Sequence, residues 1–472
     1  MPPKLALLIC TVFVLFLLRM ERKQSPQVSR ALWVPTSWML IIASKPLGTW
    51  FQSGGGGEAG SLLDQLFLIA LFCLSLLILE SRSFNWSRAM KGNIWLCLLI
   101  GYMFCSVLWS DIPFISFKRW IRELIAVLMA FLVLSEQDPR QAMQSLFKRT
   151  IYILIPFSII LIKYFPEYGV QFRNQGGMMW IGATLQKNSL GRLCLTAVFF
   201  LIWTLLQRWQ GRDMPADKHQ TLADLSILAL TLYIMSGPEG QYSATAVASL
   251  SAGLGAFFIM LLMKKRRINL GANTLTVIMA AIISIGVLQP FIGGSAVSGF
   301  ASTLGRDSTL TGRTEIWEAL VPLVMRQPIF GSGLGSYCSP TDREMEKICE
   351  AHNGYLEVVL DFGFAGLLFF VMFLLSSCRK AQRKLGHDFD WASFQICFFL
   401  MALIHNMAES SINSFTSQLT AVLLFLTVSS TTATSRTPEI TPIRTSTRNT
   451  KFLPYSRKKK TTAASIQSVN HR

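Results

Sequence analysis

Apolar runs long enough to cross a membrane recur along most of the chain and are separated by short polar connections. About 20 apolar residues suffice for a helix to cross a bilayer, whereas the strands of a membrane barrel alternate over about ten residues. These runs are continuously apolar and rich in leucine. They predict spans at residues 5–18, 31–48, 62–79, 94–109, 120–135, 150–165, 189–206, 222–236, 244–263, 273–292, 355–376, 391–407 and 413–430. The expected fold class is an all-α polytopic integral membrane protein with about 12–13 transmembrane helices.

The longest polar connection divides the predicted spans into two groups. Residues 1–292 contain the first group, the connection itself covers residues 293–354, and residues 355–430 contain the last spans. Residues 431–472 are rich in Thr, Ser, Arg and Lys and short of large apolar residues, a composition typical of disordered chains. We therefore expect two sets of transmembrane helices, one long loop between them, and a basic, disordered tail.

The chain carries a formal net charge of +18, and its basic residues cluster in short connections beside the spans and in the tail. Such clusters mark the cytoplasmic connections of membrane proteins, so this charge does not call for a nucleic-acid partner. The clusters lie at residues 19–23, 264–267, 379–384 and 457–460. Placing all four in the cytoplasm puts the long connection outside and the C-terminus inside. The first span, residues 5–18, is short, and the side of the N-terminus stays open.

Two of the nine cysteines lie in the long connection, whereas the other seven fall in or near predicted spans. An oxidising compartment would allow Cys338 and Cys349 to form a disulfide. Closing a loop of about a dozen residues would contribute on the order of 3 kcal/mol to stability. Two unpaired thiols are the alternative. No second Cys or His pair accompanies them, so the sequence does not predict a zinc site.

Within the long connection, residues 315–324 have apolar side chains at helical spacing. This pattern predicts an amphipathic helix at the outer membrane interface, with Trp317 as an interfacial anchor. Arg313 would stand near the positive end of this helix, where an anionic group is attracted. An ion pair between Arg313 and Glu315 or Glu318 is the alternative interpretation.

The glycine-rich stretch at residues 328–336 resembles a nucleotide-binding loop only superficially. No β-strand is predicted before it and no Rossmann-type helix after it, so we do not expect dinucleotide binding. The glycines are expected to let the backbone turn tightly and approach a ligand or a neighbouring helix.

The order and spacing of short motifs along this region resemble the core of the O-antigen ligase and polysaccharide polymerase superfamily. The stretches GRDSTLTGRTEIW at 305–317 and QKNSLG at 186–191 are most similar to the exopolysaccharide polymerase branch. The other motifs are Thr311-Gly312-Arg313, Trp317, Pro328, Gly331-Ser332-Gly333, His352-Asn353-Gly354-Tyr355-Leu356-Glu357 and Gly363-Phe364-Ala365-Gly366.

The resemblance implies a membrane glycosyltransferase with a multi-spanning, GT-C-like architecture in the bacterial inner membrane. Its donor would be an oligosaccharide on undecaprenyl diphosphate, and its acceptor a glycan or a lipid. The resemblance implies neither a metal ion nor another cofactor. A chain-length regulator or an export complex is the protein partner that such an enzyme would have.

Three functions remain open at this point. Polymerisation of lipid-linked repeats into an exopolysaccharide or O-antigen-like polymer is the preferred interpretation, because the motifs are closest to that branch. An O-antigen ligase that transfers a glycan to lipid A core or protein is the first alternative. A polysaccharide or lipid-linked oligosaccharide transporter is the alternative from another class. The predicted spans argue against it, because ion-coupled carriers place ionisable residues deep in the membrane.

Two residues are the candidate catalytic groups. Breaking the bond between sugar and diphosphate leaves negative charge on the departing oxygen, which the guanidinium of Arg313 would stabilise. His352 is the candidate base for the acceptor hydroxyl, because imidazole titrates near neutral pH. The candidate substrate-binding residues are Arg306, Arg173 and Lys187 for the diphosphate, and Asn353, Tyr355 and Glu357 for sugar hydroxyls. For the last three residues, capping or anchoring the next helix is the alternative interpretation.

Overall fold

The computed structural model describes the chain over most of its length. The described residues are 1–51, 61–172, 177–211, 218–238, 242–268, 271, 273–292, 311–338 and 349–429. The predicted disordered tail at 431–472 and the first part of the predicted loop at 293–310 therefore lie outside the described residues.

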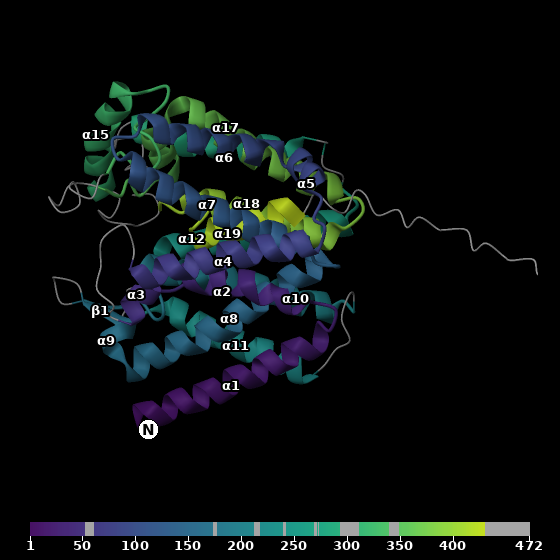
Figure 1. The fold of residues 1–472 in the computed structure, drawn as a ribbon. Coiled ribbons are helices and arrows are strands. Elements are labelled where there is room, and N and C mark those ends of the chain that lie inside the picture. Colours follow the sequence, from purple (N-terminus) through teal and green to yellow (C-terminus); the bar gives the residue numbers. More distant parts are fainter. Residues whose placement is uncertain are drawn as a thin grey trace, which may run out of the picture. The chain divides into compact units, whose positions relative to one another are not determined.

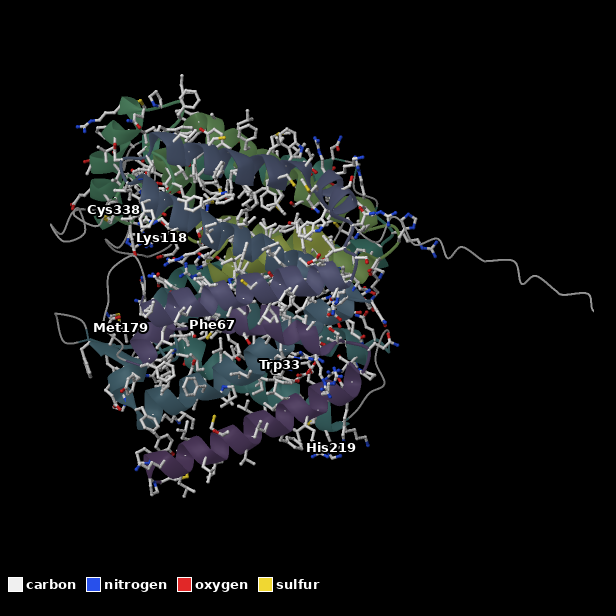
Figure 2. The ribbon with its side chains drawn as sticks, viewed as in Figure 1. Trp33, Phe67, Lys118, Met179, His219 and Cys338 are labelled. Atoms are coloured by element: carbon white, nitrogen blue, oxygen red, sulfur yellow. A yellow bond between two sulfur atoms is a disulfide. The ribbon has the colours of Figure 1, made fainter. Side chains whose placement is uncertain are left out.

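The described part of Met1–Thr434 is a bundle of helices (Figure 1). Lys118 and Cys338 lie at one end of the helices and His219 at the opposite end (Figure 2). The helices are α1 Pro3–Gln24, α2 Trp33–Ile42, α3 Leu47–Trp50, α4 Leu62–Ser81, α5 Trp86–Gly92, α6 Ile94–Cys105, α7 Pro113–Leu134, α8 Pro139–Tyr164, α9 Pro166–Gly169, α10 Lys187–Trp209, α11 Lys218–Ser236, α12 Ala244–Lys265, α13 Thr274–Ile292, α15 Thr311–Arg326, α17 Gly354–Lys384, α18 Phe389–Asn406 and α19 Gln418–Ser429. Two short antiparallel strands, β1 Val170–Phe172 and β2 Met178–Trp180, pair so that Val170 lies opposite Trp180.

The predicted all-α membrane architecture is confirmed, and each of the thirteen apolar segments contains a helix in the structure. Among the described residues, seven helices are long and apolar enough to cross a membrane: α1, α4, α8, α10, α12, α13 and α17. An eighth span results if α5 and residues 94–109, which meet at an angle of 93°, are counted as one. The first span is longer than predicted because α1 continues through the basic cluster to Gln24.

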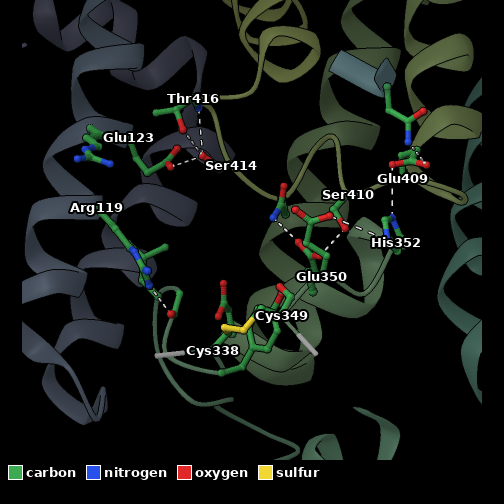
Figure 3. Close-up of a pocket in the computed structure, with 18 of the residues that line it drawn as sticks. Arg119, Glu123, Cys338, Cys349, Glu350, His352, Glu409, Ser410, Ser414 and Thr416 are labelled. Atoms are coloured by element: carbon green, nitrogen blue, oxygen red, sulfur yellow. Dashed lines mark hydrogen bonds and ion pairs between the residues drawn. A yellow bond between two sulfur atoms is a disulfide. The ribbon is translucent and has the colours of Figure 1, made fainter. Parts of the chain in front are cut away.

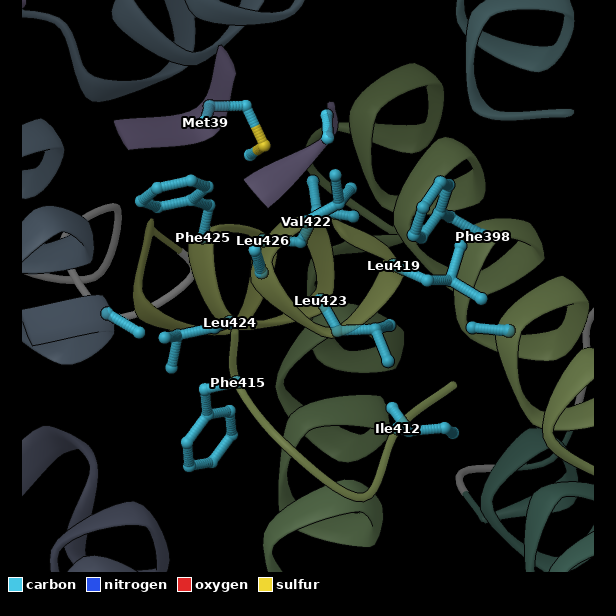
Figure 4. Packing of buried hydrophobic residues seen from close by; sticks show 14 of the residues in the cluster. Met39, Phe398, Ile412, Phe415, Leu419, Val422, Leu423, Leu424, Phe425 and Leu426 are labelled. Atoms are coloured by element: carbon cyan, nitrogen blue, oxygen red, sulfur yellow. The ribbon is translucent and has the colours of Figure 1, made fainter. Parts of the chain in front are cut away.

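Helix α19 lies inside the bundle. Its 12 residues extend for about 18 Å, which is less than the roughly 30 Å hydrocarbon thickness of a bilayer. Leu419, Leu424 and Phe425 on different faces of this helix are all buried, and they belong to one packed cluster with Met39 of α2 and Phe398 of α18 (Figure 4). A helix that is apolar on every side is expected in such a core position, surrounded by other helices.

Helix α17 is interrupted at Gly363, where φ is 63° and ψ is −170°. The carbonyls of Leu360 and Asp361, which lose their helical partners there, accept hydrogen bonds from Ser332 (3.0 Å) and Gly333 (2.8 Å). In return, the N–H groups of residues 364 and 365 donate to carbonyls of residues 328 and 329, at 2.8 and 3.1 Å. The glycine-rich segment is thus built into the break of α17, as expected for glycines that approach a neighbouring helix.

This close approach depends on glycine at two positions. A Cβ atom on Gly331 would come within 2.5 Å of the backbone of α17, and one on Gly363 within 2.2 Å of the Ile329 carbonyl oxygen. Both residues also have positive φ, at 66° and 63°, a conformation that other residues adopt at a steric cost. The segment that follows, up to Cys338, is therefore held against α17 by the backbone itself.

Two ion pairs are buried toward the end of the bundle at which His219 lies (Figure 2). Arg149 Nε of α8 lies 2.9 Å from Glu21 Oε2 of α1, and both side chains are 2% exposed. Arg208 Nη1 lies 2.7 Å from Asp224 Oδ2, joining α10 to α11. Buried ion pairs fix the relative positions of helices, because neither charge is stable there without its partner.

Replacing Glu21 with alanine is expected to destabilise the protein by about 3–5 kcal/mol, because Arg149 would remain buried without its counter-charge. The matched control is Lys264→Ala, since Lys264 Nζ lies 3.3 Å from Asp390 but is 36% exposed. Exposed pairs contribute only about 0–1 kcal/mol. Unfolding of both variants in detergent micelles would be followed by circular dichroism. Equal changes in the unfolding midpoint would contradict a stabilising role for the buried pair.

Candidate active site

A polar cavity of about 330 Å³ opens where α7, α10 and α17 meet the segments before α17 and before α19 (Figure 3). Its walls carry both cations and acids, in contrast to the apolar bundle around them. The charged side chains that line it are Arg119, Arg122, Glu123, Arg192, Glu350, His352, Glu357, Asp361 and Glu409. The described neutral polar residues that line it include Gln186, Asn188, Ser410, Asn413, Ser414 and Thr416.

Glu409 connects the two candidate catalytic residues. Its Oε1 atom accepts hydrogen bonds from Arg313 Nη2 at 2.9 Å and from Asn188 Nδ2 at 2.8 Å. Its Oε2 atom lies 3.5 Å from His352 Nδ1. The Glu409 side chain is only 9% exposed, whereas that of His352 is 31% exposed. One carboxylate therefore holds an arginine from α15 and the imidazole at the cavity wall.

The backbone around His352 is constrained on both sides. His352 has φ of 48°, a left-handed conformation that is uncommon for residues with a side chain. The next residue, Asn353, accepts hydrogen bonds from Tyr355 N and Leu356 N, both at 3.0 Å, and so caps the start of α17. Asn353 also donates to the carbonyl of Gly286 at 3.0 Å. Strained backbone of this kind persists where its surroundings fix it, and it is common at functional sites.

The pKa values of His352 and Glu409 move in opposite directions. The hydrogen bond to Glu409 raises the pKa of His352 above its usual value, although burial and the charge of Arg313 oppose this. For Glu409, burial acts to raise the pKa, but the hydrogen bond from His352 and the charge of Arg313 outweigh it and lower the pKa. Glu409 is therefore held as a carboxylate, and it favours the imidazolium form of His352.

Three arginines of α7 and α10 line the cavity. Arg119 of α7 donates to the carbonyl of Gly335. Arg192 of α10 donates from Nη1 to the carbonyl of Ser410 at 3.3 Å and from Nη2 to Ser189 Oγ at 2.8 Å. Arg122 also lines the cavity from α7. Guanidinium groups placed in this way can bind the oxygens of a phosphate.

Two comparisons with known proteins relate this geometry to a family. Residues 239–371, which contain Arg313 and His352, match the family model described as O-antigen ligase. The exopolysaccharide production protein ExoQ of Rhizobium meliloti (strain 1021) is 23% identical over 351 residues, covering 70% of this chain and 75% of ExoQ. Both comparisons relate the chain to the O-antigen ligase and polymerase family by similarity. The resemblance expected from the motifs is thereby confirmed.

The structure separates the residues expected to bind sugar hydroxyls. Glu357 lines the cavity, where it accepts hydrogen bonds from Ala351 N at 3.0 Å and from the Ser410 hydroxyl. Asn353 and Tyr355 are buried and are not among the described residues that line the cavity. The hydroxyl of Tyr355 donates to the carbonyl of Leu403 at 3.1 Å, so it joins α17 to α18.

The cations that line the cavity differ from those expected to bind the diphosphate. Lys187, at the start of α10, lines a separate small pocket with Trp180 and Tyr242. Arg306 and Arg173 lie outside the described residues. Among the described residues, the arginines that line the cavity come from α7 and α10 instead. The sequence signal that could have identified these arginines is their position in otherwise apolar helices, because charged residues are rare in membrane spans and mark functional sites.

Two interpretations of the loop helix are corrected. Trp317 is 2% exposed and donates from Nε1 to the Ala351 carbonyl at 2.9 Å, so it packs inside the protein and is no interfacial anchor. Arg313 pairs with Glu409 and not with Glu315 or Glu318. Helix α15 therefore turns its apolar side and its arginine toward the segment that contains His352.

A disulfide joins Cys338 to Cys349, with Cα atoms 5.3 Å apart. Both cysteines line the cavity, and Tyr337 donates from its hydroxyl to the Cys349 carbonyl at 2.8 Å. The segment that ends the glycine-rich stretch is thereby fastened to the segment that contains His352. Covalent closure of this kind limits the positions that His352 can take relative to α17.

Proposed function

We propose that this protein polymerises lipid-linked oligosaccharide repeats at the outer face of the bacterial inner membrane, with undecaprenyl diphosphate as the lipid carrier of the donor. The observation that carries the proposal is the cavity in which His352, held by Glu409, faces a wall that bears Arg119, Arg122 and Arg192. A base and a cluster of guanidinium groups are the two functions needed to transfer a glycan from a diphosphate.

The reaction forms one glycosidic bond and breaks one bond to phosphate. An acceptor hydroxyl attacks the anomeric carbon of the donor sugar, and its proton moves to Nε2 of neutral His352. The bond between that carbon and the diphosphate oxygen breaks, and undecaprenyl diphosphate leaves with the electron pair. Arginine side chains at the cavity wall stabilise the negative charge on the leaving oxygens, so the proposal calls for no metal ion or cofactor.

The charge distribution supports the outward orientation of the cavity. The cavity lies at the end of the bundle where α10 and α17 begin. Lys264 and Lys265 are in the last turn of α12, and Arg383 and Lys384 are in the last turn of α17. The positive-inside rule assigns such ends to the cytoplasm, which leaves the first turn of α17 and the cavity on the other side.

O-antigen ligase activity is the second candidate function, because the matched family model carries that description. The two activities share a donor and differ in the acceptor. A polymerase adds the glycan to another lipid-linked repeat, whereas a ligase transfers it to lipid A core or protein. The similarity to the exopolysaccharide production protein ExoQ supports the polymerase as the first choice.

The test uses cells that lack the gene and the same cells complemented with the wild-type protein. Polysaccharide chain length and the pool of lipid-linked glycans would be measured in both, with membrane protein levels matched. A polymerase predicts that polymer is lost and that single lipid-linked repeats accumulate on the outer face. Accumulation of long, untransferred lipid-linked chains would identify a ligase. Repeats that accumulate only on the inner face would identify a transporter and overturn the proposal.

A further inference from the structure

Asp361 is a buried carboxylate at the cavity for which the proposed reaction has no role. It lies on α17, one helical turn beyond Glu357, and both residues line the cavity. The residue is 8% exposed. Its position in the helix is fixed by the neighbouring break at Gly363 and by the hydrogen bond from Gly333 N to its own carbonyl at 2.8 Å.

The carboxylate of Asp361 is only partly satisfied. The backbone N–H groups of Gly335 and Tyr337 lie near it. Its Oδ1 atom, however, is buried and has no hydrogen-bond partner in the part of the chain that the structure describes. Burying a carboxylate oxygen without a partner is costly, so an acceptor in this position indicates a donor group that arrives with a ligand.

Glu357 shows the contrasting arrangement on the same face of α17. Its two carboxylate oxygens accept hydrogen bonds from Ala351 N, the Ser410 hydroxyl and Asn413 Nδ2. It therefore joins the segments that form the mouth of the cavity. Asp361 has no such set of described side-chain donors, and its buried Oδ1 atom has no hydrogen-bond partner among the described residues.

The chemistry of this group restricts the ligand that it can bind. Glu357 stands one helical turn away, so this part of the cavity wall presents two carboxyl groups and suits the diphosphate of the donor poorly. Hydroxyl groups of a sugar ring are neutral and can both donate and accept hydrogen bonds, so they can pair with a buried carboxyl group. Arg119, whose charge also acts on Asp361, supplies a donor for the oxygens of the same ring.

We propose that Asp361 binds a hydroxyl group of the acceptor sugar and thereby determines which sugar is accepted. This inference rests on the proposed glycosyl transfer and assigns the deep part of the cavity to the acceptor. A site built to accept a hydrogen bond from a hydroxyl discriminates strongly against an analogue that lacks it, because its buried oxygen is then left unpaired.

The test compares acceptor analogues in membrane vesicles that contain the full-length protein. Lipid-linked repeats extracted from cells lacking the gene would serve as substrate. Methyl glycosides of the sugars in the strain's polysaccharide, and their single-deoxy derivatives, would serve as competing probes. For the wild-type protein, removal of one particular hydroxyl is expected to weaken competition by roughly 10- to 100-fold.

The measured quantity is the ratio of the competing strengths of the parent probe and its deoxy derivative. Asp361→Ala is expected to reduce this ratio to about one, and Asp361→Asn, which keeps one acceptor oxygen, to an intermediate value. Glu80→Ala, a change of an exposed acid at the end of α4, is the control and should keep the wild-type ratio. A purely structural role for Asp361 would lower transfer with every probe and leave the ratio unchanged. The Asn variant provides the same comparison if the Ala variant does not reach the membrane.

Two results would overturn the inference. One is an unchanged ratio in both Asp361 variants, and the other is a wild-type protein that does not discriminate between any parent and deoxy pair. Failure of the proposed function is distinguishable from both, because it would appear as absence of transfer from the lipid-linked repeat by the wild-type protein itself.

Discussion

Replacing His352 with alanine is expected to lower the rate of glycan transfer by about 10²- to 10⁴-fold, the range that a positioned general base contributes. The imidazole lies at the cavity wall with Nδ1 directed to Glu409, at 3.5 Å, and this leaves Nε2 to take the proton of the acceptor hydroxyl. Transfer from lipid-linked repeats would be measured in membranes with matched amounts of protein.

His387→Ala is the control for this variant, because His387 is an exposed histidine in the connection between α17 and α18. It should retain wild-type transfer. His352→Gln separates the base from a hydrogen-bonding role, since glutamine can hold an acceptor hydroxyl but cannot take its proton at neutral pH. Transfer by His352→Gln at the wild-type rate would exclude the imidazole as the base.

Replacing Glu409 with glutamine is expected to reduce transfer by about 10- to 100-fold, the size of effect seen when the partner that orients a functional histidine is removed. The change should also move the acid limb of the pH profile to lower pH. Proton transfer needs neutral His352, and the carboxylate raises the pKa of this imidazole by favouring its protonated form. Without the carboxylate charge, His352 becomes neutral at a lower pH than in the wild-type protein.

Glu350→Gln is the matched control for Glu409→Gln. Glu350 Oε2 lies 4.0 Å from His352 Nε2, but the Glu350 side chain is 59% exposed, so solvent screens its charge. We expect a smaller change in both rate and pH profile than for Glu409→Gln, because Glu350 is the weakest of the influences on the pKa of His352. The measurement is the rate of transfer between about pH 5 and pH 9, the range in which a histidine of raised pKa titrates. A lower rate in Glu409→Gln with an unmoved acid limb would indicate only a structural role.

The order of the helices could be predicted from the sequence because a membrane span is a local property of composition. Each predicted segment contains a helix, and the long connection contains the helix expected around residues 315–324. The lengths were less accurate where polar residues continue a helix. Lys148 and Arg149, for example, lie inside α8, although the apolar pattern begins only at residue 150.

The candidate site was predictable where one short motif holds its residues, as with His352 and Glu357. Glu409 was not among the predicted site residues, because its contacts with Arg313 and Asn188 join residues 96 and 221 positions away in the sequence. Whether Asn353 and Tyr355 orient a sugar or support a helix stayed open for a related reason. Sequence alone does not distinguish a polar side chain that faces a cavity from one that caps or joins helices, as both do here.

The exchange of backbone hydrogen bonds at Gly363 has a mechanical consequence for the enzyme. Sliding the glycine-rich segment, residues 328–336, along α17 would break four hydrogen bonds of 2.8 to 3.1 Å together. Inside a membrane, little water is present to replace the lost hydrogen bonds. The segment therefore cannot move by small steps that break these hydrogen bonds one at a time. We expect the glycine-rich segment and the first half of α17 to form one rigid wall of the cavity. A long glycan must then be admitted by movement of the opposite wall, which is the segment between α18 and α19.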